Sequence, residues 1–121
     1  MSKLNILVVD DDHDFAESLA DALTICGHKV EIAFSGEDAV KIFAARDFHI
    51  TFMDVRLPGK SGVESFLEIR KIKENARVVM MTGYSVEQVL DQAVQNGAWG
   101  VINKPLNMEK MIQMLDRIKP A

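Results

Sequence analysis

Short apolar runs alternate with amphipathic stretches along the whole chain. The runs are four to six residues long and rich in Val, Ile, Met and Phe, which is typical of buried strands. They predict strands at residues 5–10, 29–34, 50–54, 77–82 and 99–103. Apolar residues at helical spacing predict helices at residues 13–26 and 107–118, and further helices after Ser35, Ser61 and Ser85.

Residues that cap helices stand at the expected ends of these stretches. Asp12 precedes the first helix, and Gly27 follows it where a left-handed C-cap is favoured. The Ser61-x-x-Glu64 pattern is a capping box, and Ser35 begins a similar pattern with Asp in the acidic position. A fourth helix is predicted to end at Gly97.

Five strands that alternate with five helices, with short loops between them, favour a parallel sheet covered on both faces. We therefore expect a three-layer α/β/α sandwich. With 121 residues and neither repeats nor low-complexity tracts, residues 1–121 are predicted to form a single domain.

Composition narrows the classes of function. Hydrophobic residues make up 48% of the chain and charged residues 26%, as in an ordinary globular protein. The net charge of −4 gives no general attraction to nucleic acid or to anionic membranes, and no apolar run is long enough to span a bilayer. The single cysteine, Cys26, is interpreted as a packing residue and suits a reducing cytoplasm.

The candidate chemistry lies where the predicted strands end. In parallel sheets of this kind, ligands bind outside the carboxyl ends of the strands. Polar residues follow strands one, three, four and five at that edge, and they are Asp10, Asp11, Asp12, Asp54, Thr82 and Lys104. We expect these side chains to converge on one site.

Carboxylates held close together repel one another unless a cation is present. An all-oxygen ligand set favours Mg²⁺, or Mn²⁺, over zinc. Two carboxylates suffice to position such an ion, and a third can act as nucleophile and form an aspartyl phosphate. No glycine-rich nucleotide-binding motif is present, so a phosphohistidine or a small acyl phosphate is a better donor than ATP. The histidines His13, His28 and His49 stand singly, and only His13 adjoins the acidic run.

Four motifs occur in order at the strand ends. They are Val8-Val9-Asp10-Asp11, Met53-Asp54-Val55-Arg56-Leu57-Pro58-Gly59, Met81-Thr82-Gly83 and Lys104-Pro105. With these motifs the sequence resembles, over nearly its whole length, the receiver domain of two-component response regulators. The resemblance implies a flavodoxin-like sheet of order 2-1-3-4-5, and it is compatible with a receiver cut from a longer regulator.

The resemblance also implies residue roles. Asp54 would be the phosphoacceptor. Asp11, Asp54 and the backbone carbonyl of Arg56 would bind Mg²⁺, with Asp10 holding a metal-bound water. Lys104 would bind the phosphoryl group, with a cis peptide before Pro105, and Thr82 would be the switch hydroxyl.

The implied protein is a cytoplasmic signalling switch and not an enzyme beyond its own phosphorylation and slow dephosphorylation. Its donor would be a sensor histidine kinase or a histidine phosphotransfer protein. Its output would pass through the face of helix four, strand five and helix five to an output domain or partner, with a phosphorylation-dependent dimer as one form of output. Direct nucleic-acid binding by this segment is not expected.

The sequence departs from the family pattern at several positions. Val101 replaces a frequent aromatic switch residue, so Thr82 is expected to switch without an aromatic rotamer change. Ser61 stands where many members of the family have Asp, and we expect no loss of function from this replacement. Arg56 and Tyr84 flank the phosphoryl site, and we expect their bulk to hinder hydrolytic water, which mutation of both to alanine would test. The methionines of the last helix, Met108, Met111 and Met114, are interpreted as core residues more readily than as a partner-binding stripe.

Two other interpretations remain open from the residues. Asp10-Asp11-Asp12 after a strand also fits a phosphohydrolase of the haloacid-dehalogenase type, with Asp10 as the nucleophile. That interpretation leaves Asp54 without a role. The second interpretation is a degenerate receiver that acts as a phosphorylation-independent scaffold.

Overall fold

Five parallel strands form a single sheet in the order β2-β1-β3-β4-β5, which confirms the predicted α/β topology. The structure is a computed structural model that describes residues 3–83, 95 and 97–118. The strands are β1 (Asn5–Val9), β2 (Lys29–Ala33), β3 (Ile50–Asp54), β4 (Val78–Thr82) and β5 (Gly100–Asn103). Because every strand runs in the same direction, all five carboxyl ends meet at one edge of the sheet.

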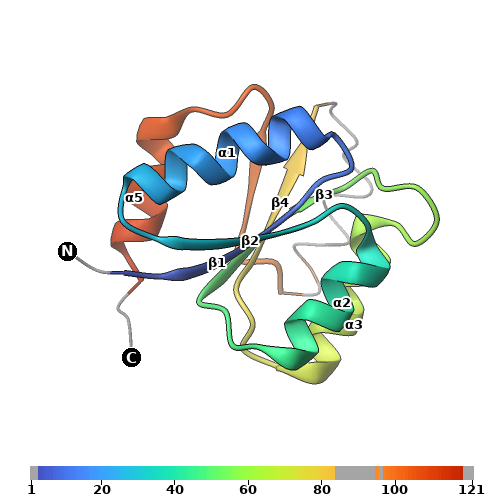
Figure 1. Cartoon of the computed structure of the whole chain (residues 1–121). Helices are drawn as coiled ribbons and strands as arrows, with labels where there is room; N and C mark the ends of the chain where they lie inside the picture. Colours follow the sequence, from blue (N-terminus) through green and yellow to red (C-terminus); the bar gives the residue numbers. More distant parts are fainter. Residues whose placement is uncertain (1–2, 84–94, 96, 119–121) are drawn as a thin grey trace.

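Helices cover both faces of the sheet. Figure 1 shows α1 (His13–Ile25) and α5 (Met108–Asp116) on one face and α2 (Gly36–Ala45) and α3 (Gly62–Ile72) on the other. The fourth predicted helix, which follows Ser85, lies outside the described residues. Within the described part of the chain no helix has the length and apolar character that a membrane crossing requires.

The alternating side chains of the strands divide the core into two layers. Under α2 and α3, Phe43 and Phe66 pack against Val9 and Met53. Under α1 and α5, residues such as Leu23 and Met111 pack against the opposite faces of the same strands. All five residues of β3 and of β4 are buried, which explains why these strands are mostly apolar on both faces instead of alternating between apolar and polar residues.

Among the described residues, the caps predicted at Asp12 and Ser61 are present, and the one predicted at Ser35 is present in part. The Asp12 carboxylate accepts a hydrogen bond from the Phe15 backbone N–H at 3.1 Å and so begins α1. Ser61 and Glu64 form the full capping box of α3, whereas Ser35 supplies only the first half of the predicted box by accepting from Asp38 N–H. Several elements are one or two residues shorter than predicted, because their terminal residues serve as caps or leave the strand ladder.

One glycine is required where α3 begins. A Cβ atom on Gly62 would lie 2.0 Å from the backbone oxygen of Asp54, so a side chain there would push the helix away from the end of β3. The close approach of this helix therefore helps to fix the position of Asp54.

The last helix confirms the core interpretation of its methionines. Met111 is buried, and Met108 and Met114 are partly buried against the same core layer. Ile112, the residue after Met111, is 39% exposed, because successive helical residues point about 100° apart. Cys26 is half-buried at the C-cap of α1 rather than within the helix.

Candidate functional site

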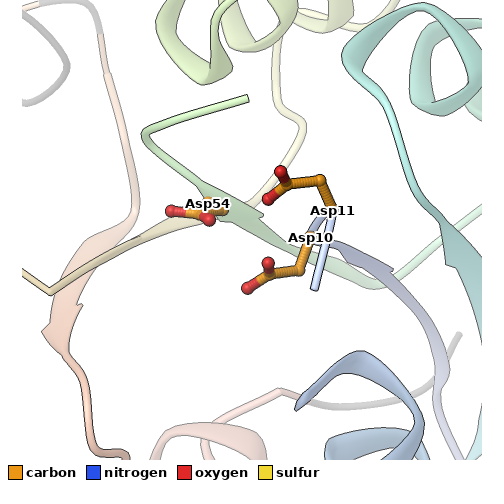
Figure 2. Close-up of side chains that lie close together, drawn as sticks. All are labelled: Asp10, Asp11 and Asp54. Atoms are coloured by element: carbon orange, nitrogen blue, oxygen red, sulfur yellow. The ribbon is translucent and has the colours of Figure 1, made fainter. Parts of the chain in front are cut away.

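Three acidic side chains meet at the carboxyl edge of the sheet. Asp10 and Asp11 follow β1, and Asp54 is the last residue of the neighbouring strand β3 (Figure 2). One carboxylate oxygen from each lies within 4.8 Å of the other two. Asp10 is fully buried and Asp54 is 8% exposed, whereas Asp11 is open to solvent. The predicted convergence of these three residues is confirmed.

Lys104 enters the same cluster from the loop after β5. Its ammonium nitrogen lies 2.6 Å from Asp10 Oδ2 and 3.4 Å from Asp54 Oδ2. The lysine is thus closer to Asp10 than to Asp54, in an ion pair that the sequence does not predict. One cation compensates part of the negative charge on these carboxylates, and they retain a net negative charge among them.

The electrostatics reflect this crowding. Burial, followed by the charge of Asp10, raises the pKa of Asp54, although Lys104 and the Arg56 backbone N–H oppose the rise. Burial alone would lower the pKa of Lys104, but its contacts with Asp10 and Asp54 outweigh burial and raise it. The ionised form of Asp54 is therefore stabilised less than in water, and a further cation beside it would be bound favourably.

Backbone groups orient both buried carboxylates. The Asp12 N–H donates to Asp10 Oδ1 at 3.0 Å, and the Arg56 N–H donates to Asp54 Oδ1 at 3.2 Å. In Asp10 each carboxylate oxygen therefore has a partner, since Oδ2 is paired with Lys104. Asp54 is held more loosely by the lysine, whose contact with its Oδ2 is longer, at 3.4 Å.

The predicted switch residues lie in β4 and β5. Thr82 ends β4 and is buried, and its backbone oxygen accepts from the Lys104 N–H at 2.7 Å. Val101 lies in β5 and packs, half-buried, against the core layer under α2 and α3. The Lys104–Pro105 peptide bond is cis, as predicted. Arg56 is exposed next to Asp54, and Tyr84 lies outside the described residues.

Two aromatic contacts at the site were not anticipated. The Lys104 ammonium lies 4.3 Å from the centroid of the Phe15 ring, and the rings of His13 and Phe34 stack with their centroids 3.7 Å apart. Helical spacing identifies Phe15 only as a core residue. The contact with Lys104 could have been suspected from one feature of the sequence. Phe15 lies five residues after Asp10, on the first turn of the helix that follows the acidic run.

The donor set suits a hard divalent cation. All three side chains offer carboxylate oxygens, and they are close enough to share one ion. After burial, the charge of Asp10 is the second cause that raises the pKa of Asp54, and a bound cation would offset both. Among the described residues, this is the one group of three or more acidic, histidine or cysteine side chains with such geometry. The residues therefore fit Mg²⁺.

Sequence comparison identifies the family. Residues 6–116 match the family profile described as the response regulator receiver domain. The chain belongs to this family.

Individual relatives agree with the assignment. A response regulator receiver protein of Anaeromyxobacter sp. (strain Fw109-5) is 32% identical over 108 residues, which is 89% of this chain and 45% of the relative. A CheY-like receiver domain from Methanospirillum hungatei JF-1 has a TM-score of 0.90 at 26% identity, over 97% of this chain and 93% of that one.

A third relative shows chemistry at an aspartate. The structure of a response regulator from Burkholderia pseudomallei, described with a phosphorylated aspartic acid, a calcium ion and citrate, has a TM-score of 0.83 at 32% identity, over 89% of this chain and 64% of that one. The chain spans less than half the length of the first curated relatives that it matches, 45% and 26%. Receiver domains of response regulators are signalling modules that act with histidine kinases or phosphotransfer proteins and with output domains.

Proposed function

We propose that Asp54 accepts a phosphoryl group from a phosphohistidine donor. A carboxylate oxygen of Asp54 attacks phosphorus, an O–P bond forms, and the N–P bond of the donor breaks. The electron pair of that bond returns to the donor imidazole, which takes up a proton. The observation behind this proposal is that Asp54 lies at the carboxyl edge of the sheet beside two further carboxylates and a lysine, and that the lysine is farther from Asp54 Oδ2, at 3.4 Å, than from Asp10 Oδ2, at 2.6 Å.

The neighbouring residues have separate roles in this proposal. Asp11, Asp54 and the backbone carbonyl of Arg56 would hold Mg²⁺, or Mn²⁺, and Asp10 would hold one of its waters. When bound, the ion neutralises charge on the phosphoryl oxygens. Lys104 would shift from Asp10 toward the phosphoryl group and bind one of its oxygens. Thr82 would donate its hydroxyl hydrogen to another.

Asp54 is favoured over Asp10 as the nucleophile. Asp10 is fully buried, and both of its oxygens already accept hydrogen bonds, one from Lys104 and one from the Asp12 N–H. An attack by Asp10 would require breaking its short ion pair. The haloacid-dehalogenase interpretation is therefore the weaker one, and the phosphorylated aspartate described for the Burkholderia pseudomallei relative supports an acceptor role.

The proposed output is a change between two conformations of the domain. Movement of Thr82 toward the phosphoryl group would alter the packing around Val101 and β5. The surface of the neighbouring α5 would change with it, and an output domain or partner would bind this changed surface. Catalysis would be limited to the domain's own phosphorylation and slow dephosphorylation. A phosphorylation-dependent dimer and a cytoplasmic location stay predictions from the sequence.

The decisive experiment is phosphorylation of the intact protein with a small donor. Incubation with phosphoramidate or acetyl phosphate and Mg²⁺ should add one phosphoryl group by mass spectrometry, and omission of Mg²⁺ should abolish the addition. Reduction with borohydride and peptide mapping should place the group on Asp54.

A matched pair of variants gives the control. Asp54→Asn should abolish labelling, whereas Asp12→Asn should retain it, because Asn also caps helices well and Asp12 is exposed. Labelling of Asp10 would instead support the phosphohydrolase. Absence of labelling from every donor, with partner binding retained in Asp54→Asn, would support the scaffold interpretation.

A further inference from the structure

The contact between Lys104 and Phe15 joins the reactive edge of the sheet to the hydrophobic core. The ammonium nitrogen lies 4.3 Å from the ring centroid of Phe15, within the range of a cation–π interaction. The same nitrogen pairs with Asp10 and Asp54. Lys104 therefore has three attractive neighbours, of which two are charged and one is an aromatic ring.

The position of the Phe15 ring is itself fixed from two sides. The Phe15 N–H donates to the capping carboxylate of Asp12, which sets the first turn of α1. The half-buried side chain packs against the core layer under α1 and α5. The ring is thus held by the helix cap and by the core.

An aromatic ring has an advantage over the carboxylates as a support for Lys104. Asp10 attracts the ammonium at 2.6 Å and occupies one of its hydrogen-bond donors, so it competes with any incoming phosphoryl oxygen. A ring attracts the cation through its π face without requiring a hydrogen bond of fixed direction. It can hold the ammonium while the remaining N–H groups turn toward a new acceptor.

We propose that Phe15 is a positioning residue for Lys104, holding the ammonium over its ring so that the lysine can move from Asp10 to the phosphoryl group on Asp54. This rests on the proposed function, since it assigns Lys104 to phosphoryl binding. It adds a residue outside the four motifs of the family, on the first turn of α1.

The first test is spectroscopic and needs no phosphorylation. In the resting protein, the ε-CH₂ protons of Lys104 should be shifted upfield by the ring current of Phe15, and a Lys104→Arg variant assigns the resonance. Phe15→Leu should remove the upfield shift and Phe15→Tyr should retain it. A Lys104 resonance that is unchanged in Phe15→Leu would overturn the proposal.

The second test is the rate of phosphorylation by acetyl phosphate with saturating Mg²⁺. Phe15→Leu should slow the reaction by about fivefold, and Phe15→Tyr should restore it to within about twofold of the wild type. Phe34→Leu is the matched control, because Phe34 is also half-buried against the same core layer but its ring stacks on His13. Equal slowing in Phe34→Leu and Phe15→Leu would overturn the proposal.

A double-mutant cycle separates positioning from general packing. If Phe15 acts through Lys104, Phe15→Leu should cause no further slowing in a Lys104→Ala background. The same fivefold slowing in that background would show that Phe15 acts through the core, and it would overturn the proposal. Failure of the wild type to accept any phosphoryl group would refute the proposed function instead, while the ring-current measurement would still decide whether Phe15 holds the lysine.

Discussion

The two ends of the sheet use titratable residues in opposite ways. At the carboxyl edge, Asp10 and Asp54 are buried close together and depend on Lys104 for compensation. At the amino edge, His28 and His49 accept hydrogen bonds from the backbone N–H groups of Leu4 and Asn5, at 3.2 and 2.9 Å. The first arrangement concentrates charge, and the second satisfies the start of β1 without any charge.

The amino-edge histidines are well placed for this structural task. His28 immediately precedes β2 and His49 immediately precedes β3, the two strands that flank β1. In each ring Nδ1 is the acceptor, which requires that this nitrogen carry no proton. Such half-buried histidines complete the hydrogen bonding at the start of a strand, and their positions are explained without a ligand.

The difference teaches how to distinguish a site from a structural feature. A buried polar group with all its hydrogen bonds made, and without excess charge, contributes to stability. Buried like charges that remain only partly compensated are costly for the fold, and such clusters are found at functional sites. A hollow of about 670 Å³ at the amino edge, lined by residues that include Asn5, His28 and Arg46, lacks that excess charge, because the two acidic and two basic side chains in its lining balance.

The largest effect is expected from removal of the cation at the carboxyl edge. Lys104→Ala leaves Asp10 and Asp54 buried without their partner, so the free energy of unfolding should fall by about 2 kcal/mol at neutral pH. Because the pKa of Asp54 is already raised, its protonation at lower pH should recover part of the loss. Urea unfolding at pH 7.5 and 5 measures both effects.

Addition of Mg²⁺ sharpens the same prediction. The ion should restore stability in Lys104→Ala more than it stabilises the wild type, because it replaces the missing positive charge. If neither acid nor Mg²⁺ reduced the stability loss of Lys104→Ala, the loss would not come from the uncompensated charge of Asp10 and Asp54, and the prediction would be wrong.

A smaller effect is expected at the amino edge. His49→Ala removes the acceptor of the Asn5 N–H and should lower the free energy of unfolding by about 1 kcal/mol, with the phosphorylation rate unchanged. His49→Gln, which retains an acceptor oxygen on a flexible chain, should lose less. If His49→Ala slowed phosphorylation as much as Lys104→Ala does, the amino edge would not have the purely structural role assigned to it.

The pH dependence of stability should show the role of His28. Burial lowers the pKa of His28 below its ordinary value of 6.5, although Asp116 opposes the shift. The unfolded chain therefore binds the proton more readily, so this contribution to stability is complete above pH 6.5 and declines as the pH falls through 6.5 toward the folded pKa.

A variant that cannot titrate isolates this contribution. In His28→Gln the decline below pH 6.5 should be shallower than in the wild type, as measured by urea unfolding between pH 8 and 5. Parallel pH profiles for the two proteins would show that His28 does not control this range.

The smallest effect is expected from a salt bridge on the rim of the amino edge. Arg46 pairs with Glu31, but the two side chains are 62% and 41% exposed. Solvent screens such a pair, so Arg46→Ala should change the free energy of unfolding by about 0.5 kcal/mol or less. Thermal unfolding at low and high salt provides the check, and a salt-dependent loss as large as that of His49→Ala would contradict the prediction.

Much of the site followed from the sequence alone. The alternation of apolar runs and amphipathic stretches predicts a parallel sheet, and in such a sheet residues that follow different strands meet at one edge. Asp10, Asp11, Asp54 and Lys104 could therefore be grouped before any coordinates were known. Local hydrogen bonding likewise determines the caps at Asp12 and Ser61, because each cap depends on residues three positions away.

The tertiary structure decided the contacts between side chains far apart in the chain. That Lys104 pairs with Asp10, 94 residues away, and lies on the ring of Phe15 depends on how the loop after β5 meets the end of β1 and the first turn of α1. The bonds of His28 and His49 to β1, across 24 and 44 residues, depend equally on strand order. Periodicity and capping report on neighbours within a few positions, whereas these partners are selected only when the whole sheet has formed.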